Sequence, residues 1–301
     1  MPLILSRRQW LAGVAGAMGG VGFAASATAA VRRAFTVDPE LVTVTRHHVG
    51  GSDPAAPVLR IVQLTDLHLD SVGAHEERVA AAVAAHRPDV IVFTGDSIDD
   101  DARVGVLGEF LELLDGGTRK FAVVGDGERA AGIDVRELGR VYATRGCELL
   151  INDVADLSVG GRRVLVTGLD DFVRGTADPA RALVGSEPTP NHLLLAHSPA
   201  QRDAIRWERV TPAATARIAD GPEVDLAPYR PQWMLSGHTH GGQVAPFGLA
   251  PFRPRGSGRY VSGWYRDAVP ALYVSRGIGT SLIDARYRAT PEVPVFEWAL
   301  A

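Results

Sequence analysis

Gln63-Leu64-Thr65-Asp66-Leu67-His68 closes an apolar run and leaves an aspartate and a histidine two residues apart. Residues 59–64 have the short, largely apolar pattern typical of a buried strand. Alternation at the end of that strand would send Asp66 and His68 to the same side of the backbone, where both could reach one cation. Taken alone, the triplet favours a plainer interpretation, an N-cap aspartate beside a hydrogen-bonded histidine. The rest of the chain reverses that preference.

Two further strands, each preceded by a helix, repeat this arrangement. The apolar patterns predict helices at residues 74–86 and 104–114 and strands at residues 59–64, 89–94 and 120–124. Asp66, Asp96 and Asp126 follow these strands at intervals of 30 residues. Successive βα units form a parallel sheet with its ligand site at the carboxyl ends of the strands, so the three carboxylates should meet there. Each alone could be a helix cap, but three in register make that explanation poor.

The second half of the chain predicts a change of sheet type. Helix formers at 129–145 are interrupted by Gly132 and Gly139. The elements expected next are antiparallel strands at 148–151 and 154–168 with a Gly160-Gly161 turn, a helix at 179–184, strands at 192–196 and 232–236, and strands of a second sheet at 271–275 and 293–298. Residues 201–231 contain four prolines and no sustained period. They indicate a partly helical insertion over the site, with disorder as the alternative.

Histidines follow two of the later strands. His197 follows the strand at 192–196, and Gly237-His238-Thr239-His240 follows the strand at 232–236. The candidate ligand set is therefore Asp66, His68, Asp96, Asp126, His197, His238 and His240. Carboxylate and imidazole ligands suit Mn, Fe, Zn or Co, and the lack of thiolates argues against a structural zinc site. Two ions about 3.5 to 4 Å apart can clamp a phosphate, and Asp96, central in the order, is the candidate for the carboxylate that bridges them.

The order of these motifs resembles that of the calcineurin-like metallophosphoesterases. The similarity covers about residues 57–300, and the segment Gly237-His238-Thr239-His240-Gly241-Gly242-Gln243 matches closely. The resemblance implies an α/β fold, a four-layer α/β/β/α sandwich of two mixed sheets. Gly168-Leu169-Asp170-Asp171 and residues 273–280 resemble the exported branch of the family, which hydrolyses phosphodiesters and includes lipid-sugar pyrophosphatases.

The resemblance also implies a ligand set and a reaction. It assigns Asp66, His68, Asp96 and His240 to a first divalent ion, and Asp96, Asp126, His197 and His238 to a second. The implied reaction is hydrolysis of a phosphodiester or pyrophosphate bond by a hydroxide that bridges the two ions. The implied substrate is a phosphodiester or a nucleotide- or lipid-linked pyrophosphate.

One block departs from the family pattern. Gly125-Asp126-Gly127-Glu128 stands where the family usually has Gly-Asn-His followed by an acid. Asp126 keeps an oxygen ligand, but Gly127 removes a phosphate-contacting group and general acid, which typically contributes about 10² to 10⁴ in rate. We expect a slow enzyme that does best on good leaving groups, with Arg129 and Arg276 as candidates for supplying the missing charge.

Two other functions follow from the same residues. Gly127 also fits a degenerate phosphoesterase that binds metal and serves as a binding protein. A nuclease is disfavoured because the net charge is -4 and there is no basic stripe, so no nucleic-acid partner is expected.

Residues 1–30 predict an export signal, which leaves 31–301 as a single domain. Ser6-Arg7-Arg8-Gln9-Trp10-Leu11 resembles the twin-arginine signal, and a Gly/Ala-rich apolar stretch follows it at 11–25. A membrane span is the alternative, but the apolar stretch is short. We expect the twin-arginine export machinery as a partner, and a location in the periplasm or on the outer face of the cytoplasmic membrane, with association at the membrane surface.

The remaining residues carry weaker signals. With 46% apolar and 22% charged residues the composition is that of a globular protein, and the single cysteine, Cys147, cannot form an internal disulfide. Asp170 and Asp171 are expected either to orient a ligand histidine or to cap a turn. The histidines expected at the surface or in caps are His47, His48, His75, His86 and His192.

Overall fold

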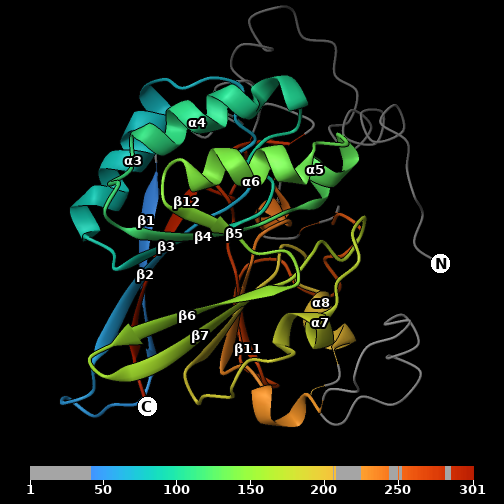
Figure 1. Ribbon diagram of the computed structural model, residues 1–301. Helices are drawn as coiled ribbons and strands as arrows, with labels where there is room; N and C mark the ends of the chain where they lie inside the picture. Colours follow the sequence, from blue (N-terminus) through green and yellow to red (C-terminus); the bar gives the residue numbers. More distant parts are fainter. Residues whose placement is uncertain (1–41, 206, 208–224, 244–249, 251–252, 282–285) are drawn as a thin grey trace, which may run out of the picture. The chain divides into compact units, whose positions relative to one another are not determined.

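In the part of the chain that the structure describes, two six-stranded sheets form the centre of the protein (Figure 1). The structure is a computed structural model, and it describes residues 42–205, 207, 225–243, 250, 253–281 and 286–301. These residues belong to one compact unit, Val37–Ala301. The predicted export signal lies outside the described residues, as does most of the predicted insertion.

The first sheet carries the three aspartate-bearing strands side by side. Its order is β1 (Thr43–Gly50), β12 (Glu292–Ala299), β2 (Val58–Leu64), β3 (Val90–Thr94), β4 (Arg119–Val123) and β5 (Cys147–Leu149). Strands β2 to β5 are parallel, whereas β12 runs antiparallel to β2 and parallel to β1. The carboxyl ends of β2, β3 and β4 therefore lie at one edge, as the βα pattern predicts.

The second sheet carries the histidine-bearing strands in the same way. Its order is β10 (Gly263–Tyr265), β11 (Ala271–Val274), β9 (Trp233–Ser236), β8 (His192–Leu195), β7 (Arg162–Gly168) and β6 (Asp153–Val159). The central strands are parallel, and the predicted hairpin of β6 and β7 makes one antiparallel edge. Both sheets are thus mixed, as expected.

Helices complete the four predicted layers. Helices α3 (Ala74–His86), α4 (Val104–Glu112) and α6 (Val135–Ala143) cover the outer face of the first sheet (Figure 1). The outer face of the second sheet packs against α7 (Pro179–Leu183). The remaining helical segments are short: α5 (Asp126–Ala130), α8 (Gln201–Ala204), and the 3₁₀ turns η1 (Asp101–Arg103), η2 (Ala227–Tyr229) and η3 (His240–Gly242). No helix in the described ranges is long and apolar enough to cross a membrane.

Alternation along the strands explains why the sequence reads as unbroken apolar runs. On β2, Val62 and Leu64 pack under the helices, whereas Leu59 and Ile61 pack between the two sheets. Both faces of the strand are therefore buried, and every position favours an apolar residue. The layer between the sheets is closed by large aromatics, among them the fully buried Trp298.

Three predictions about elements are wrong. Strand β5 is parallel to β4 in the first sheet, with Cys147 opposite Lys120, rather than part of an antiparallel set. Strand β12 lies in the first sheet, not the second. Gly139 does not interrupt α6; it lies inside the helix, facing Leu149 of β5, where a Cβ would make an ordinary contact at 3.7 Å.

Candidate metal centre

The site forms where the carboxyl ends of both sheets meet. Asp66, Asp96 and Asp126 follow β2, β3 and β4, and His197 and His238 follow the adjacent strands β8 and β9. Buried hydrogen bonds tie the two edges together. Gln63 Nε2 on β2 donates to the Ser236 carbonyl at 3.0 Å, and His197 Nδ1 lies 2.8 Å from the Thr94 carbonyl. The two halves of the chain therefore share one site.

All seven predicted positions come together there, in two groups. Within each group the ligand atoms lie within 4.8 Å of one another. We call Asp66, His68 and His240 cluster 1, and Asp96, Asp126, His197 and His238 cluster 2.

Asp96 lies between the two clusters. Its Oδ2 is 3.3 Å from His197 Nε2 in cluster 2 and 3.8 Å from His68 Nε2 in cluster 1. One carboxylate oxygen thus faces ligand atoms of both groups. A carboxylate in this position could contribute to a site in either cluster.

Most of these residues stand on left-handed backbone rather than on the strands themselves. The φ angles are +52° at Asp66, +45° at His68, +53° at Asp96, +73° at His238 and +50° at His240. The alternation expected for Asp66 and His68 is therefore wrong, although both side chains reach the site. The loops are held by backbone hydrogen bonds, from Asp66 N to the Gly95 carbonyl and from His68 N to the Asp96 carbonyl, both 3.0 Å. Such backbone is uncommon outside glycine and often marks functional sites.

Glycines let neighbouring backbone approach the carboxylates. A Cβ at Gly237 would lie 2.2 Å from Asp66 Oδ2, and a Cβ at Gly125 would lie 2.1 Å from Asp96 Oδ1. No side chain fits at either distance. The glycines before His238 and Asp126 are therefore needed for space.

Three of the four histidines are held by a hydrogen bond at the ring nitrogen that faces away from the clusters. His197 Nδ1 faces the Thr94 carbonyl at 2.8 Å, His238 Nε2 faces the Arg255 carbonyl at 2.9 Å, and His68 Nδ1 faces the Asp99 carboxylate at 2.6 Å. Because each of these oxygens can only accept, the facing nitrogen carries the proton. The other nitrogen of each ring faces the clusters, and it is the one that could bind an ion in exchange for its proton.

His240 is held differently. Its Nδ1 lies 3.3 Å from Nη2 of the buried Arg286, and its Nε2 lies 3.1 Å from His68 Nε2. Burial, aided by the charges of His68 and Arg286, keeps the pKa of His240 well below its ordinary value. The ring is therefore neutral, which is the form that binds a cation.

Electrostatics keeps cluster 2 charged. Burial opposes ionisation of Asp126, but hydrogen bonds and charges from His197 and His238 outweigh it and lower the pKa of this carboxyl. Burial also opposes the charged form of His197, yet Asp96 and Asp126 raise its pKa well above the ordinary value. Without an ion, protons on histidine balance the carboxylates; a divalent cation would take over that role. The donor set and its charge fit divalent metal ions.

Comparison with known proteins agrees with this geometry. The family model of the calcineurin-like phosphoesterases matches residues 59–242. The chain belongs to the calcineurin-like phosphoesterase family. It is 28% identical over 302 residues to the uncharacterized metallophosphoesterase YkuE of Bacillus subtilis, covering 97% of both chains. It is also 28% identical over 268 residues to the phosphodiesterase YaeI of Escherichia coli, covering 86% of this chain and 89% of that protein.

Solved structures resemble the chain more distantly. A 5'-nucleotidase precursor from Thermus thermophilus aligns with 81% of this chain and 54% of its own, at 12% identity and a TM-score of 0.42. The family match and the observed layers, not this likeness, identify the phosphoesterase fold. The family uses divalent metals, and the two clusters are candidate ligands for them.

Two acidic residues of this phosphoesterase were missed as parts of the site. Glu128 is buried, and its carboxylate accepts from the backbone N–H groups of Asp96 (3.0 Å), Ser97 (2.7 Å) and Gly125 (2.8 Å). Asp99 faces His68, as described above. Glu128 closes the Gly-Asp-Gly-Glu block and Asp99 lies three residues after Asp96, so only their nearness to the motifs hinted at a role.

The two candidate arginines lie in different settings. Arg129 donates through Nε and Nη2 to Asp170 Oδ1, at 2.9 and 2.6 Å, so its charge is already paired. Arg276 lies beside Gly241, whose Cβ would be 2.8 Å from Arg276 Cγ, next to His240. Its Nε is 3.2 Å from Oε2 of the buried Glu292, so its charge is paired as well. Arg276 thus packs against the residue that follows a ligand of cluster 1, whereas Arg129 is turned to Asp170.

Asp170 and Asp171 build a turn. Asp170 accepts from the backbone of Asp171 at 2.8 Å and of Thr176 at 2.9 Å, and Asp171 accepts from Val173 N and Arg174 N at 2.8 and 2.5 Å. Of the two expected roles, the contacts favour the cap of a turn.

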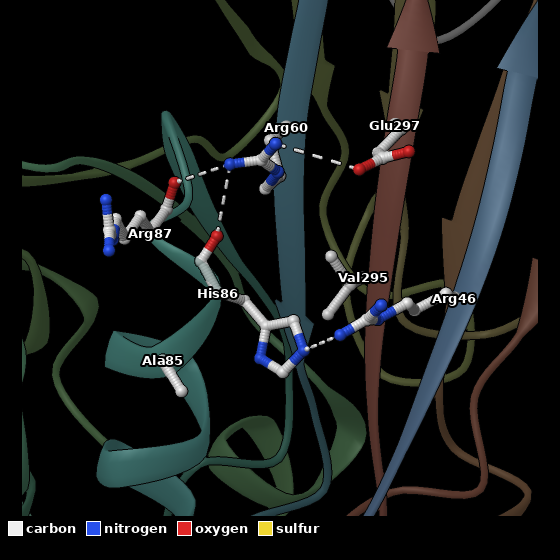
Figure 2. Close-up of a pocket in the computed structure, with 7 residues that line it drawn as sticks. All are labelled: Arg46, Arg60, Ala85, His86, Arg87, Val295 and Glu297. Atoms are coloured by element: carbon white, nitrogen blue, oxygen red, sulfur yellow. Dashed lines mark hydrogen bonds and ion pairs between the residues drawn. The ribbon is translucent and has the colours of Figure 1, made fainter.

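A pocket of about 300 Å³ lies at the opposite end of β2 from the clusters (Figure 2). Its lining is Arg46, Arg60, Ala85, His86, Arg87, Val295 and Glu297. Arg60 Nη1 donates to the His86 and Arg87 carbonyls at 3.3 and 3.4 Å, and its Nη2 is 3.7 Å from Glu297. Arg46 pairs with the His86 ring at 3.3 Å. Much of the pocket's charge is therefore paired within it, and it includes none of the predicted ligands.

Proposed function

We propose that this phosphoesterase hydrolyses a phosphodiester or pyrophosphate bond with two divalent ions held by its two clusters. Asp66, His68 and His240 would hold one ion, and Asp126, His197 and His238 the other. The observation that carries the proposal is the position of Asp96, one oxygen of which faces both clusters. When bound, two such ions would supply polarisation of a phosphoryl group and activation of water at neutral pH.

The chain's own residues set the geometry of that reaction. Asp96 would fix the separation of the ions, and the carbonyls of Thr94 and Arg255 hold two of the rings in place. A ligand set of carboxylate oxygens and imidazole nitrogens suits Mn, Fe, Zn or Co.

The substrate class follows from Gly127. The position has no side chain, and its backbone N–H donates to Asp96 Oδ1 at 2.7 Å. No group at 127 can therefore protonate a departing alkoxide. We propose substrates whose leaving group needs no proton, such as nucleotide- or lipid-linked pyrophosphates, with Arg276 as the candidate cation near the phosphate.

Hydrolysis of bis-p-nitrophenyl phosphate by the purified protein tests the proposal. Turnover should disappear with EDTA and return with Mn²⁺. Asp96→Asn should remove it, whereas Asp101→Asn, the same change at an exposed residue nearby, should not. Absence of turnover with Mn, Fe, Zn and Co alike would contradict the proposal.

Gly127 also supports a second candidate, a binding protein on a degenerate phosphoesterase fold. Both candidate proteins would bind metal ions, but only the enzyme would hydrolyse an ester. Two bound ions without turnover of any activated ester would favour the binding protein. Faster turnover of p-nitrophenyl than of phenyl esters would favour the enzyme without a general acid.

Export is a separate proposal that rests on Arg7 and Arg8. We propose that the twin-arginine machinery carries the protein to the periplasm or the outer face of the cytoplasmic membrane. Replacing both arginines by lysine should leave the protein in the cytoplasmic fraction. An unchanged distribution would contradict this route.

A further inference from the structure

Asp99 makes the most direct side-chain contact with a predicted ligand from outside the two clusters. Its Oδ2 lies 2.6 Å from His68 Nδ1, on the far side of the ring from cluster 1. The Asp99 side chain is 53% exposed, whereas that of His68 is 5% exposed. A solvent-facing carboxylate thus holds the outer edge of a buried ligand ring.

Asp99 also occupies the space beside Gly127. A Cβ at Gly127 would lie 2.6 Å from Asp99 Oδ1 and 2.9 Å from Asp96 Oδ1. A side chain at 127 would therefore push against the carboxylate that holds His68. The contact between Asp99 and His68 therefore depends on position 127 having no side chain.

The other rings have no equivalent partner. His197 and His238 are held by backbone carbonyls, and His240 faces Arg286. Among the described residues, His68 alone of the four has its outer nitrogen held by a carboxylate in the hydrogen bonds above. Losing Asp99 should therefore affect cluster 1 and spare cluster 2.

We infer that Asp99 is a positioning residue that holds His68 for metal binding in cluster 1, and that Gly127 leaves room for it. The carboxylate accepts a hydrogen bond from Nδ1–H, fixes the ring plane, and leaves Nε2 facing His240 and Asp96. The inference rests on the proposed two-metal function, and it gives the glycine a role other than the loss of an acid.

Calorimetric titration of the metal-free full-length protein with Mn²⁺ tests the inference. Loss of such a carboxylate typically costs about 10- to 100-fold in metal affinity. Asp99→Ala should weaken one of two sites by that factor and leave the other unchanged, with Asp99→Asn intermediate. Asp101→Asn should behave as the wild type. If Asp99→Ala leaves both affinities unchanged, or weakens both equally, the inference is wrong.

A second measurement separates this inference from the proposed function. Nitrogen NMR of histidine-labelled protein saturated with diamagnetic Zn²⁺ reports whether His68 binds the ion through Nε2 and keeps its proton on Nδ1. The wild type should show that pattern, and Asp99→Ala should lose it at His68 while circular dichroism stays the same. An unchanged His68 signal would overturn the inference. A wild type that takes up no ion would instead contradict the proposed function.

A double-variant cycle tests the pairing with Gly127. Gly127→Ala should weaken the site that Asp99→Ala weakens because the new methyl group displaces the Asp99 carboxylate, and its approach to Asp96 Oδ1 at 2.9 Å adds a loss of its own. In the Asp99→Ala background the methyl group has less to displace, so the combined loss should be smaller than the product of the two single losses. Losses that multiply would show that the two positions act independently and would remove Gly127 from the inference.

Discussion

Three backbone N–H groups of the site converge on one buried carboxylate, that of Glu128. The residue binds no ion in the proposed arrangement, yet it joins the loop that carries Asp96 to the one that carries Asp126. Burial, reinforced by the charge of Asp96, raises its pKa to about 7. Its role is to shape the backbone on which the ligands stand.

Glu128→Ala should therefore destabilise the protein more than an average substitution. The change leaves three N–H groups without their acceptor, and each buried unsatisfied group costs about 1 to 3 kcal/mol. We expect the free energy of unfolding in urea to fall by roughly 3 kcal/mol or more. Glu109→Ala, at an exposed position of α4, is the matched control and should change it by less than about 0.5 kcal/mol. Equal effects would contradict the role of Glu128.

His192 gives a pH-dependent contribution to stability. It was expected at the surface or in a cap, but it is fully buried on β8, with Nε2 2.7 Å from Thr167 Oγ1 and Nδ1 2.6 Å from the Tyr229 carbonyl. Burial lowers its pKa from 6.5 to about 4. Above pH 6.5 both folded and unfolded forms are neutral; between about pH 6.5 and 4 only the unfolded form gains the proton, so stability falls.

The difference between the two pKa values corresponds to roughly 3 kcal/mol. Between pH 7 and pH 4 the wild type should lose about that much more unfolding free energy than His192→Gln, in which the other titrating groups are the same. Urea unfolding of both proteins at the two pH values measures it. Parallel losses in the two proteins would show that His192 titrates normally.

Residue type and order predicted all seven positions that meet in the clusters, because each follows a strand recognisable by its apolar run. The backbone beneath them was not predictable. Asp66 and His240 have φ near +50°, a conformation that a glycine would have signalled and these side chains do not. The position of His192 was missed for a different reason, because alternation alone cannot tell a buried histidine from an exposed one.

At the scale of elements, the presence of a strand was easier to predict than the strands with which it pairs. β12 has apolar residues on both faces, with Val295 under the helices and Phe296 between the sheets. Such a strand fits the interior of either sheet, and nothing local shows that it enters between β1 and β2. β5 has three residues, too few to show whether it runs parallel or antiparallel. The position of β12 and the direction of β5 are both set by pairing with strands distant in the sequence.

Phe296→Ala tests how strongly β12 joins the layers. The ring is fully buried, with its centroid 5.1 Å from those of Trp233 and Tyr273 on the second sheet. Truncation of a buried phenylalanine typically costs about 3 to 5 kcal/mol. We expect a loss in that range by urea unfolding, and a loss below about 1 kcal/mol for Phe172→Ala, where the side chain is 41% exposed. Similar losses would argue against this packing.

At the scale of the molecule, the clusters join segments that lie far apart in the sequence. Asp66 accepts from His238 N at 2.9 Å, and the two residues follow strands of different sheets. Ions held there would bind the folded protein and not the unfolded chain. Metal binding should therefore stabilise the whole unit against unfolding, whatever the substrate is.

Thermal unfolding with and without metal measures this coupling. A free Mn²⁺ concentration 100 times the Kd should add about 2.7 kcal/mol per site, which amounts to several degrees in Tm for a domain of this size. EDTA should reverse the shift. His238→Ala removes one ligand of cluster 2 and should reduce the shift, whereas Asp101→Asn should keep it. A Tm independent of Mn, Fe, Zn and Co would mean that the clusters bind no ion, because any ligand specific to the folded state must raise it.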